Sequence, residues 1–301
     1  MEEGQPSSTA LGAAMFRAAH LLLDDPPKIF EDTLAFSLCG CENEAALRMR
    51  LDQLAAQVAR STSPDFAQIT LRYLRAVAIM RSRYVEDEVD RAIRRGVTQY
   101  VLLGAGLDSF AYRRLDVTKD LRVFEVDHPA TQSWKRARLQ AAGVALPPNL
   151  TFVPVDFEKQ SLIERLQTSA YRINVPAVFS WLGVTEYLTP EAIFRTLRTV
   201  ASLALGTEIL FQYDLPKELL DEEAQQVLAV VMAGAAANNE PLITFFEPSR
   251  LAAQVRELGF SEVWDFSPEE ASSLYFAGRT DGLRPPASVH LMGARVSANA
   301  G

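Results

Sequence analysis

The chain has 301 residues, enough for one α/β domain with insertions or for two small domains. Hydrophobic residues make up 48% and charged residues 23% of the sequence, as in ordinary globular proteins, so we expect disorder only near the ends. The formal net charge of −8 argues against a nucleic-acid partner, because phosphates require a basic face. The apolar runs are much shorter than the roughly 20 residues of a membrane span, which argues against a membrane protein.

Two details of the composition bear on compartment and metals. The opening residues, MEEGQPSSTA, are acidic and polar, unlike a secretion signal, so we expect a cytoplasmic protein. Cys39 and Cys41 are the only cysteines, and their close spacing suits neither a disulfide nor, without a histidine cluster, a metal site. We also expect a monomer, because no apolar stripe stands out as reserved for a partner.

The first third of the chain is predicted to be helical. Between residues 8 and 95, apolar side chains recur at helical spacing, as at Leu47, Leu51 and Leu54, and strand signals are lacking. We therefore expect residues 1–95 to form a helical region that packs on or over the rest of the protein.

Strand and helix patterns alternate in the remainder, 96–301, which we expect to form the main domain. Strands are predicted at 99–103, 121–127, 150–155, 175–181 and 207–213, with helices at 129–142, 159–169 and 190–204. This alternation is typical of right-handed βαβ units in a parallel sheet. A helical stretch at 216–237, a helix at 248–259 and strands near 260–266 and 287–296 follow. The predicted fold class is α/β, doubly wound around a mostly parallel, seven-stranded sheet.

The segment that ends at Asp127 predicts a site for a nucleoside cofactor. Gly104 and Gly106 follow a buried apolar strand, and a helix is expected to begin directly after them. Small residues let a ligand approach the backbone, and the first N–H groups of a helix favour a negative group. Asp127 closes the next strand, 21 residues after Gly106, where an acid can hold both hydroxyls of a ribose. The alternatives are a tight turn without a ligand and a helix cap at Asp127.

Five other residues are candidates for the cofactor site because of their positions in the chain. Asp156 and Phe157 end the third predicted strand, where a carboxylate could bind an adenine amino group and a ring could stack; helix capping is the alternative for Asp156. Arg81 and Arg83 could reach a cofactor carboxylate or pair with nearby acids on a helix surface. His128 is either a wall of the site or a catalytic group.

Five segments, taken in order, resemble the leucine carboxyl methyltransferase family of class I S-adenosylmethionine-dependent enzymes. They are RSRYVEDEV (81–89), YVLLGAGLDSFAYR (100–113), VFEVDHPATQSWKRARL (123–139), VPVDFEKQSL (153–162) and FSWLGVTEYLTPEAI (179–193). The resemblance implies a Rossmann-like methyltransferase fold and S-adenosyl-L-methionine as cofactor. It also implies that Arg81 or Arg83 contacts the methionine carboxylate and that Gly104 is the glycine of the loop after the first strand. Asp127 would then bind the ribose hydroxyls, and Asp156 and Phe157 would contact the adenine.

One position departs from the family pattern. Many members place a glutamate just before the glycine of the fourth-strand loop, where it meets the methionine amino group. Here Leu182 precedes Gly183, and the nearest acid is Glu186. Glu186 is therefore a substitute candidate for this contact.

The reaction predicted from the resemblance is methyl transfer to oxygen. Aligning the acceptor with the methyl–sulfur axis can supply roughly 7–11 kcal/mol. A carboxylate acceptor is ionised at neutral pH and needs no base, whereas a hydroxyl usually needs one. Because histidines are few, we expect the carboxylate of a small apolar molecule, with a hydroxyl next. By analogy with class I methyltransferases, residues 214–248 are expected to form a helical lid with helices 8–75; core packing is the alternative.

Two other functions are open on this sequence. An NAD(P)-dependent oxidoreductase would use the same turn and acid, but Ser109 stands where the dinucleotide pattern requires a third small residue. A catalytically inert nucleoside-binding protein would keep the fold, and the missing glutamate favours it to a degree. Binding of NADH would favour the first alternative, and cofactor binding without turnover the second.

Overall fold

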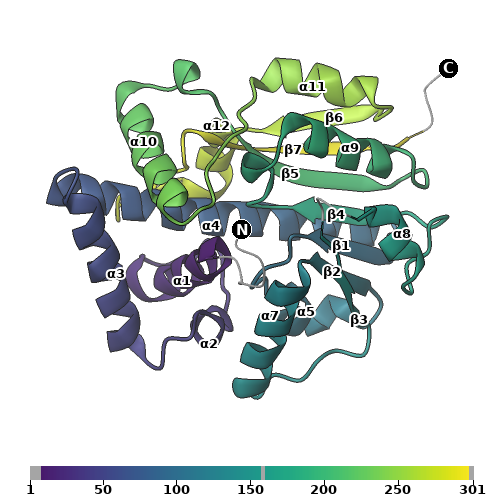
Figure 1. Ribbon diagram of the computed structural model, residues 1–301, viewed down its shortest axis with the longest axis horizontal. Helices are drawn as coiled ribbons and strands as arrows, with labels where there is room; N and C mark the ends of the chain where they lie inside the picture. The colour runs from purple at the N-terminus through teal and green to yellow at the C-terminus, as the bar shows by residue number, and fades with distance from the viewer. Residues whose placement is uncertain (1–7, 157–159, 298–301) are drawn as a thin grey trace.

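A computed structural model describes residues 8–156 and 160–297, which fold around a seven-stranded sheet (Figure 1). Its strand order is β3-β2-β1-β4-β5-β7-β6. The strands are β1 (Gln99–Leu103), β2 (Arg122–Asp127), β3 (Leu150–Pro154), β4 (Val178–Trp181), β5 (Glu208–Asp214), β6 (Glu262–Phe266) and β7 (Val289–Arg295). Strands β1 to β5 run parallel, and β7 pairs antiparallel with both β5 and β6. The predicted fold class is confirmed.

The helices cover both faces of this sheet and one of its ends. They are α1 (Ser8–Leu23), α2 (Ala35–Cys39), α3 (Glu44–Ala59), α4 (Pro64–Arg94), α5 (Phe110–Arg113), α6 (Leu115–Thr118), α7 (Pro129–Ala141), α8 (Leu162–Gln167), α9 (Pro190–Ala201), α10 (Glu222–Ala237), α11 (Pro248–Glu257) and α12 (Pro268–Ala271). Single turns η1 (Thr185–Tyr187), η2 (Lys217–Leu219) and η3 (Ser272–Phe276) complete the set. None of the helices described is both long and apolar enough to cross a membrane.

The central strands are buried because each face of the sheet has its own helical cover. Val101 and Leu103 of β1 pack into a cluster with α8, α9 and α11. Tyr100 and Leu102 point the other way, into a cluster with α4 and α7. Alternate residues of a strand face opposite sides, so a strand covered on both sides must be apolar throughout.

Three helical predictions differ from the structure. The leading region is interrupted at 24–34, where Pro26 and Pro27 lack the N–H groups that a helix needs. The stretch 216–237 is divided into η2 and α10, and α10 begins where Asp221 accepts a hydrogen bond from Ala224 N at 2.8 Å. The helix expected after Gly106 is α5, which has only four residues and offers little of a helix dipole.

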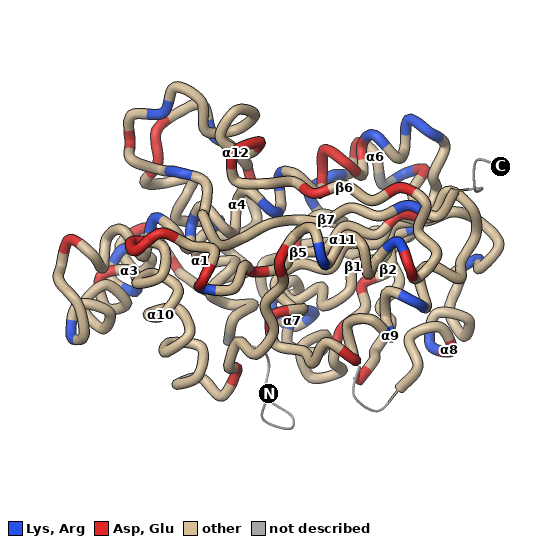
Figure 2. Tube along the Cα trace, turned by 90° about the horizontal axis from the view of Figure 1, so that it is seen from above, with Lys and Arg blue, Asp and Glu red and all other residues tan. Residues whose placement is uncertain are grey.

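Several charged side chains on the outer helices form ion pairs. Acidic and basic residues are interspersed along the chain, for example around α6 (Figure 2). Arg114 there contacts Glu86 and Asp90 of α4 at 3.3 and 3.0 Å. These pairs tie the segment after the glycine turn to the long helix α4.

Candidate active site

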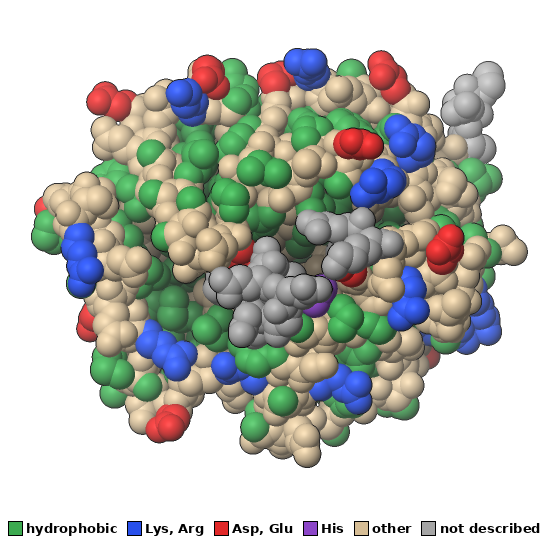
Figure 3. Space-filling view, viewed as in Figure 1, with side chains coloured by type: hydrophobic (Ala, Val, Ile, Leu, Met, Phe, Trp, Pro, Cys, Tyr) green, Lys and Arg blue, Asp and Glu red, His purple; other side chains and the backbone are tan. Residues whose placement is uncertain are grey.

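A cavity of about 1180 Å³ opens at the carboxyl ends of β1 to β5. Its walls come from these strand ends and from α1, α3, α4 and α10. Apolar side chains gather in the hollow between α3 and α10 (Figure 3). Ligand cavities commonly measure about 300–1,000 Å³, so this one has room for two molecules side by side.

The glycine turn after β1 forms the floor of the cavity. Gly104 and Gly106 both have positive φ, +66° and +45°. A Cβ on Gly104 would lie 2.4 Å from Val184 Cγ2, so no other residue fits there without a shift. Gly106 N donates to Asp127 Oδ2 at 2.5 Å, which joins the turn to the end of β2.

Asp127 faces the cavity and does not cap the next helix. His128 performs that function, because its Nδ1 accepts from Ala130 N at 3.2 Å. Asp127 Oδ1 accepts from His128 N at 2.6 Å. Burial raises the pKa of Asp127, and the N–H groups of Gly106 and His128 counteract this effect. The carboxylate is thus fixed in orientation by two backbone donors.

The cap also limits what His128 can do. With Nδ1 accepting from Ala130 N, the neutral ring carries its proton on Nε2. Such a ring can donate a hydrogen bond into the cavity, but it cannot take a proton at Nε2 while the cap persists. The geometry favours His128 as a wall of the site over a general base.

Asp156 lines the cavity at the end of β3. The alternative expectation, that it caps the next helix, does not hold for α8, where Ser161 Oγ accepts from Glu164 N at 3.5 Å. Phe157 lies outside the residues that the structure describes.

Arg81 and Arg83 point in different directions from α4. Arg81 Nη1 donates to Gln212 Oε1 at 2.8 Å and lies against Gly183, where a Cβ would be 2.6 Å away. Arg83 is exposed and pairs with Asp87 at 3.0 Å. Residues two apart on a helix diverge by roughly 200°, so only one of the two can reach the cavity. The structure brings Arg81 to the site and leaves Arg83 on the surface.

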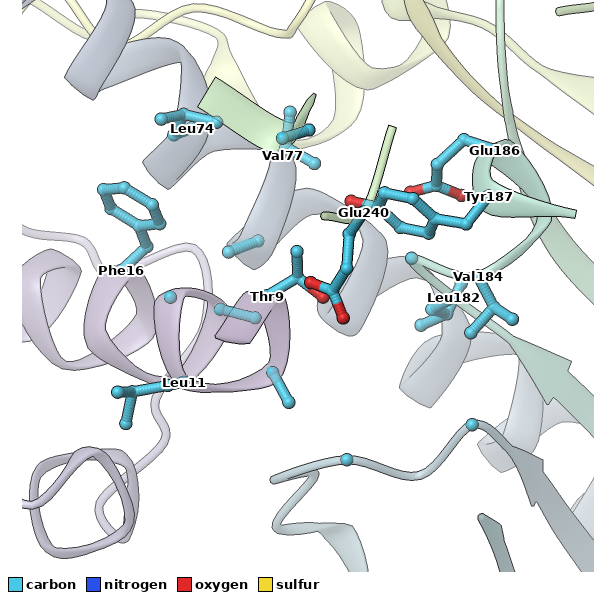
Figure 4. Close-up of a pocket in the computed structure, with 18 of the residues that line it drawn as sticks. Thr9, Leu11, Phe16, Leu74, Val77, Leu182, Val184, Glu186, Tyr187 and Glu240 are labelled. Atoms are coloured by element: carbon cyan, nitrogen blue, oxygen red, sulfur yellow. The ribbon is translucent and has the colours of Figure 1, made fainter. Parts of the chain in front are cut away.

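Glu186 extends from η1, just after β4, toward the cavity. In Figure 4 it lies with Tyr187 across the cavity from Phe16 and Leu74. The residue is only 5% exposed. Gln212 Nε2 donates to Glu186 Oε1 at 3.2 Å, but no described residue hydrogen-bonds Oε2. Burial, and then the charge of Asp214, raise the pKa of Glu186 to about 8.

Asp214 was missed by the sequence analysis. It ends β5, lines the cavity and is 4% exposed. Ser288 Oγ donates to Asp214 Oδ1 at 3.2 Å, and burial raises the pKa of Asp214 to about 6. The signal that selected Asp127 and Asp156, an acid at the carboxyl end of a strand, also applies to Asp214 and could have found it.

A comparison with protein families places this site in context. The model of the leucine carboxyl methyltransferase family matches residues 10–201, which include the glycine turn, Asp127 and Glu186. This match covers more than half of the chain. The chain belongs to the leucine carboxyl methyltransferase family.

Individual relatives agree with this family. YktD of Bacillus subtilis, a candidate S-adenosyl-L-methionine-dependent methyltransferase, is 28% identical over 303 residues, covering 98% of this chain and 99% of the relative. A protein of the same description from Mycobacteroides abscessus is 31% identical over 193 residues, covering 64% of this chain and 60% of its own. A solved candidate methyltransferase from Thermobifida fusca has a similar fold, with a TM-score of 0.54 at 18% identity over 99% of this chain and 97% of that one.

Membership of the leucine carboxyl methyltransferase family confirms the predicted enzyme class, an S-adenosyl-L-methionine-dependent methyltransferase. It favours this class over the oxidoreductase alternative. Within the family pattern, Leu182 lines the cavity where many members have a glutamate, and Glu186 lines it from the next turn. In the part of the chain that the structure describes, no three His, Cys, Asp or Glu side chains converge as metal ligands.

Proposed function

We propose that this protein transfers the methyl group of S-adenosyl-L-methionine to an oxygen atom of a small, largely apolar molecule. The observation that carries this proposal is the composition of the cavity. Asp127, His128 and Asp156 line it at the ends of β2 and β3, and apolar side chains of α3, α4 and α10 line it elsewhere, among polar ones such as Gln53 and Gln57. The apolar part is lined by Leu54, Val58, Leu74, Val77, Val230, Val231 and Leu242. One end suits a charged nucleoside cofactor and the other a hydrophobic acceptor.

The residues at the polar end fit the cofactor. Gly104 and Gly106 add no side chain of their own to the floor of the cavity, where Val184 and Ala10 pack against them. Asp127 would accept from the ribose hydroxyls, Asp156 from the adenine amino group, and Arg81 would pair with the methionine carboxylate. Glu186 lines the same cavity and is the candidate partner either of the methionine amino group or of the acceptor. When bound, the cofactor supplies a methyl group on a positively charged sulfur.

The acceptor would enter between α10 and the N-terminal helices. Residues 238–243, which follow α10, line the cavity together with residues 9–13 and 15–17 of α1. Ile243 N donates to the carbonyl oxygen of Glu186 at 2.8 Å, so this segment contacts η1 directly. We propose that residues 214–248 and helices 8–75 act as a lid that excludes water from the reaction.

A transfer assay tests the proposal. The protein is incubated with S-adenosyl-L-methionine labelled at the methyl group and with alkylphenols, alkylbenzoic acids and straight-chain fatty acids. We expect label in an organic extract with at least one class, and none with heat-denatured protein. Tight binding of S-adenosylhomocysteine without any transfer would instead support the inert nucleoside-binding alternative.

A further inference from the structure

The order of the strands orients the proposed cofactor within the cavity. Asp127 and Asp156 end β2 and β3, whereas Glu186 follows β4 and Asp214 ends β5. The sheet order β3-β2-β1-β4-β5 separates these two pairs by the glycine turn after β1. A cofactor with its ribose at Asp127 and its methionine end at Arg81 therefore directs its reactive sulfur toward the β4–β5 end. This step rests on the proposed function.

A buried polar network occupies that end of the cavity. Gln212 Oε1 accepts a hydrogen bond from Arg81, so the Nε2 group of the same amide faces Glu186 and donates to it. Gln212 also hydrogen-bonds Asp214. Tyr73 OH contacts Ser288 Oγ, which in turn donates to Asp214. Two carboxylates thus meet around one amide, where Arg81 is the nearest cation.

The oxygen of this network that lacks a partner is Glu186 Oε2. It is buried, its residue lines the cavity, and no hydrogen bond from the described residues reaches it. A buried acceptor left without a donor is unfavourable, and a donor from a ligand in the cavity would satisfy it. The backbone N–H groups of Val184 and Glu186 lie near the carboxylate and lower its pKa, but by less than burial raises it.

We infer that the acceptor is a hydroxyl compound, an alcohol or a phenol, and that the Glu186–Asp214 pair takes its proton during transfer. The acceptor O–H bond breaks and its proton passes to a carboxylate oxygen of the pair. A bond forms between the acceptor oxygen and the methyl carbon. The carbon–sulfur bond breaks, and its electrons stay on sulfur as a neutral thioether.

A carboxylate acceptor fits this end of the cavity less well. It would add a negative charge beside two buried acidic side chains, whereas a hydroxyl group can donate a hydrogen bond to Glu186 Oε2. The pair can take a proton near neutral pH, because burial raises the pKa of both carboxyl groups. This conclusion revises the first expectation of a carboxylate substrate.

Several charged or titratable groups surround the pair and take part in its titration. They are Arg81 and Tyr73 on α4, Tyr187 on η1, His290 on β7, through Tyr187 also Glu240 after α10 and, through Arg81, Arg17 on α1.

The test compares 4-pentylphenol with 4-pentylbenzoic acid, which share an apolar body and differ in the reacting oxygen. Label in a methyl ether resists mild alkaline hydrolysis, whereas label in a methyl ester is released. We expect base-stable label from the phenol, with a rate that rises between about pH 5.5 and 7.5. Glu186→Gln and Asp214→Asn should each lower kcat roughly 100-fold or more, the usual contribution of a general base. Glu257→Gln, an exposed control on α11, should leave the rate unchanged.

Binding of S-adenosylhomocysteine separates this inference from the proposed function. Both variants should bind it within about threefold of the wild type, because this inference assigns Glu186 to the acceptor in place of the methionine amino group. Transfer only to the benzoic acid, transfer to neither probe, or a phenol rate unaffected by both substitutions would overturn the inference. An affinity loss of tenfold or more in Glu186→Gln would also overturn it and would assign Glu186 to the methionine amino group. No binding by the wild type would instead overturn the proposed function.

Discussion

Arg81 reaches the cavity because Gly183 has no side chain. The Cβ of an alanine at this position would lie 2.6 Å from Arg81 Nη1, and Gly183 has a φ of +68°. We expect Gly183→Ala to displace the guanidinium and weaken S-adenosylhomocysteine binding roughly tenfold, since a hydrogen bond to a charged group contributes about 1.5–3 kcal/mol. Gly96→Ala is the matched control, because Gly96 also has a positive φ, +91°, but open space around it. Equal affinities in the two variants, measured by titration calorimetry, would contradict this role of Arg81.

Glu186 should make the stability of the apoprotein depend on pH. Its pKa in the folded state is about 8, well above the ordinary value of 4.5, so the folded state binds a proton more tightly than the unfolded state does. The free energy of unfolding should therefore fall as pH rises from about 4.5 to about 8. Glu186→Gln removes this dependence, and its stability relative to the wild type should increase by about 1 kcal/mol or more between about pH 5 and pH 8.5.

Urea denaturation at both pH values measures this effect. Glu222→Gln, which removes an exposed carboxylate from α10, should show the same stability difference from the wild type at both. If Glu186→Gln behaves like Glu222→Gln, the carboxylate of Glu186 is not desolvated as the structure indicates.

Among the elements, α1 supports the glycine turn through one arginine. Arg17 Nη2 donates to Leu107 O at 2.6 Å, and its Nε pairs with the fully buried Asp32 at 2.7 Å. We expect Arg17→Met to lower the free energy of unfolding by about 3 kcal/mol, because it leaves a buried carboxylate with less compensation. Arg48→Met breaks an exposed pair with Glu44 and should cost no more than about 0.5 kcal/mol. Thermal or urea unfolding measures both variants. If they lose similar amounts of unfolding free energy, α1 is not anchored through Arg17.

The element proposed as a lid can be examined by proteolysis. The chain turns at Asn238 and Asn239 between α10 and the segment that contacts Glu186. If α10 closes over bound ligands, S-adenosylhomocysteine should slow cleavage near these asparagines. Cleavage near Gly143, in the turn after α7, serves as the internal control. Identical digests with and without ligand would support plain packing of α10 in the core.

At the scale of the whole molecule, the sheet could be predicted because buried parallel strands are continuously apolar. The bounds expected for the first strand, 99–103, agree with β1, whereas the strand expected at 175–181 begins only at Val178. Pro176 explains this difference, since proline cannot donate a ladder hydrogen bond. Local pattern thus predicts which segments are strands better than where each one starts.

Residues of the candidate site could be predicted where their position in the chain alone determines toward which edge of the sheet they lie. Acids at the carboxyl ends of parallel strands meet at one edge of the sheet, which is why Asp127 and Asp156 could be selected. The choice between Arg81 and Arg83 depends on the rotation of α4 against the sheet. That rotation is set by tertiary packing, which one sequence does not display. The network around Gln212 was not predictable for the same reason.

The central claim is that this cavity binds S-adenosyl-L-methionine with its ribose at Asp127. Titration calorimetry of S-adenosylhomocysteine against the wild type and Asp127→Asn tests it most directly, with Asp52→Asn on the exposed face of α3 as the control. We predict micromolar binding to the wild type and the control, binding weaker by roughly 10- to 100-fold in Asp127→Asn, and none of NADH to any of them. Equal affinity in all three proteins, or binding of NADH in place of the adenosyl ligand, would contradict the account.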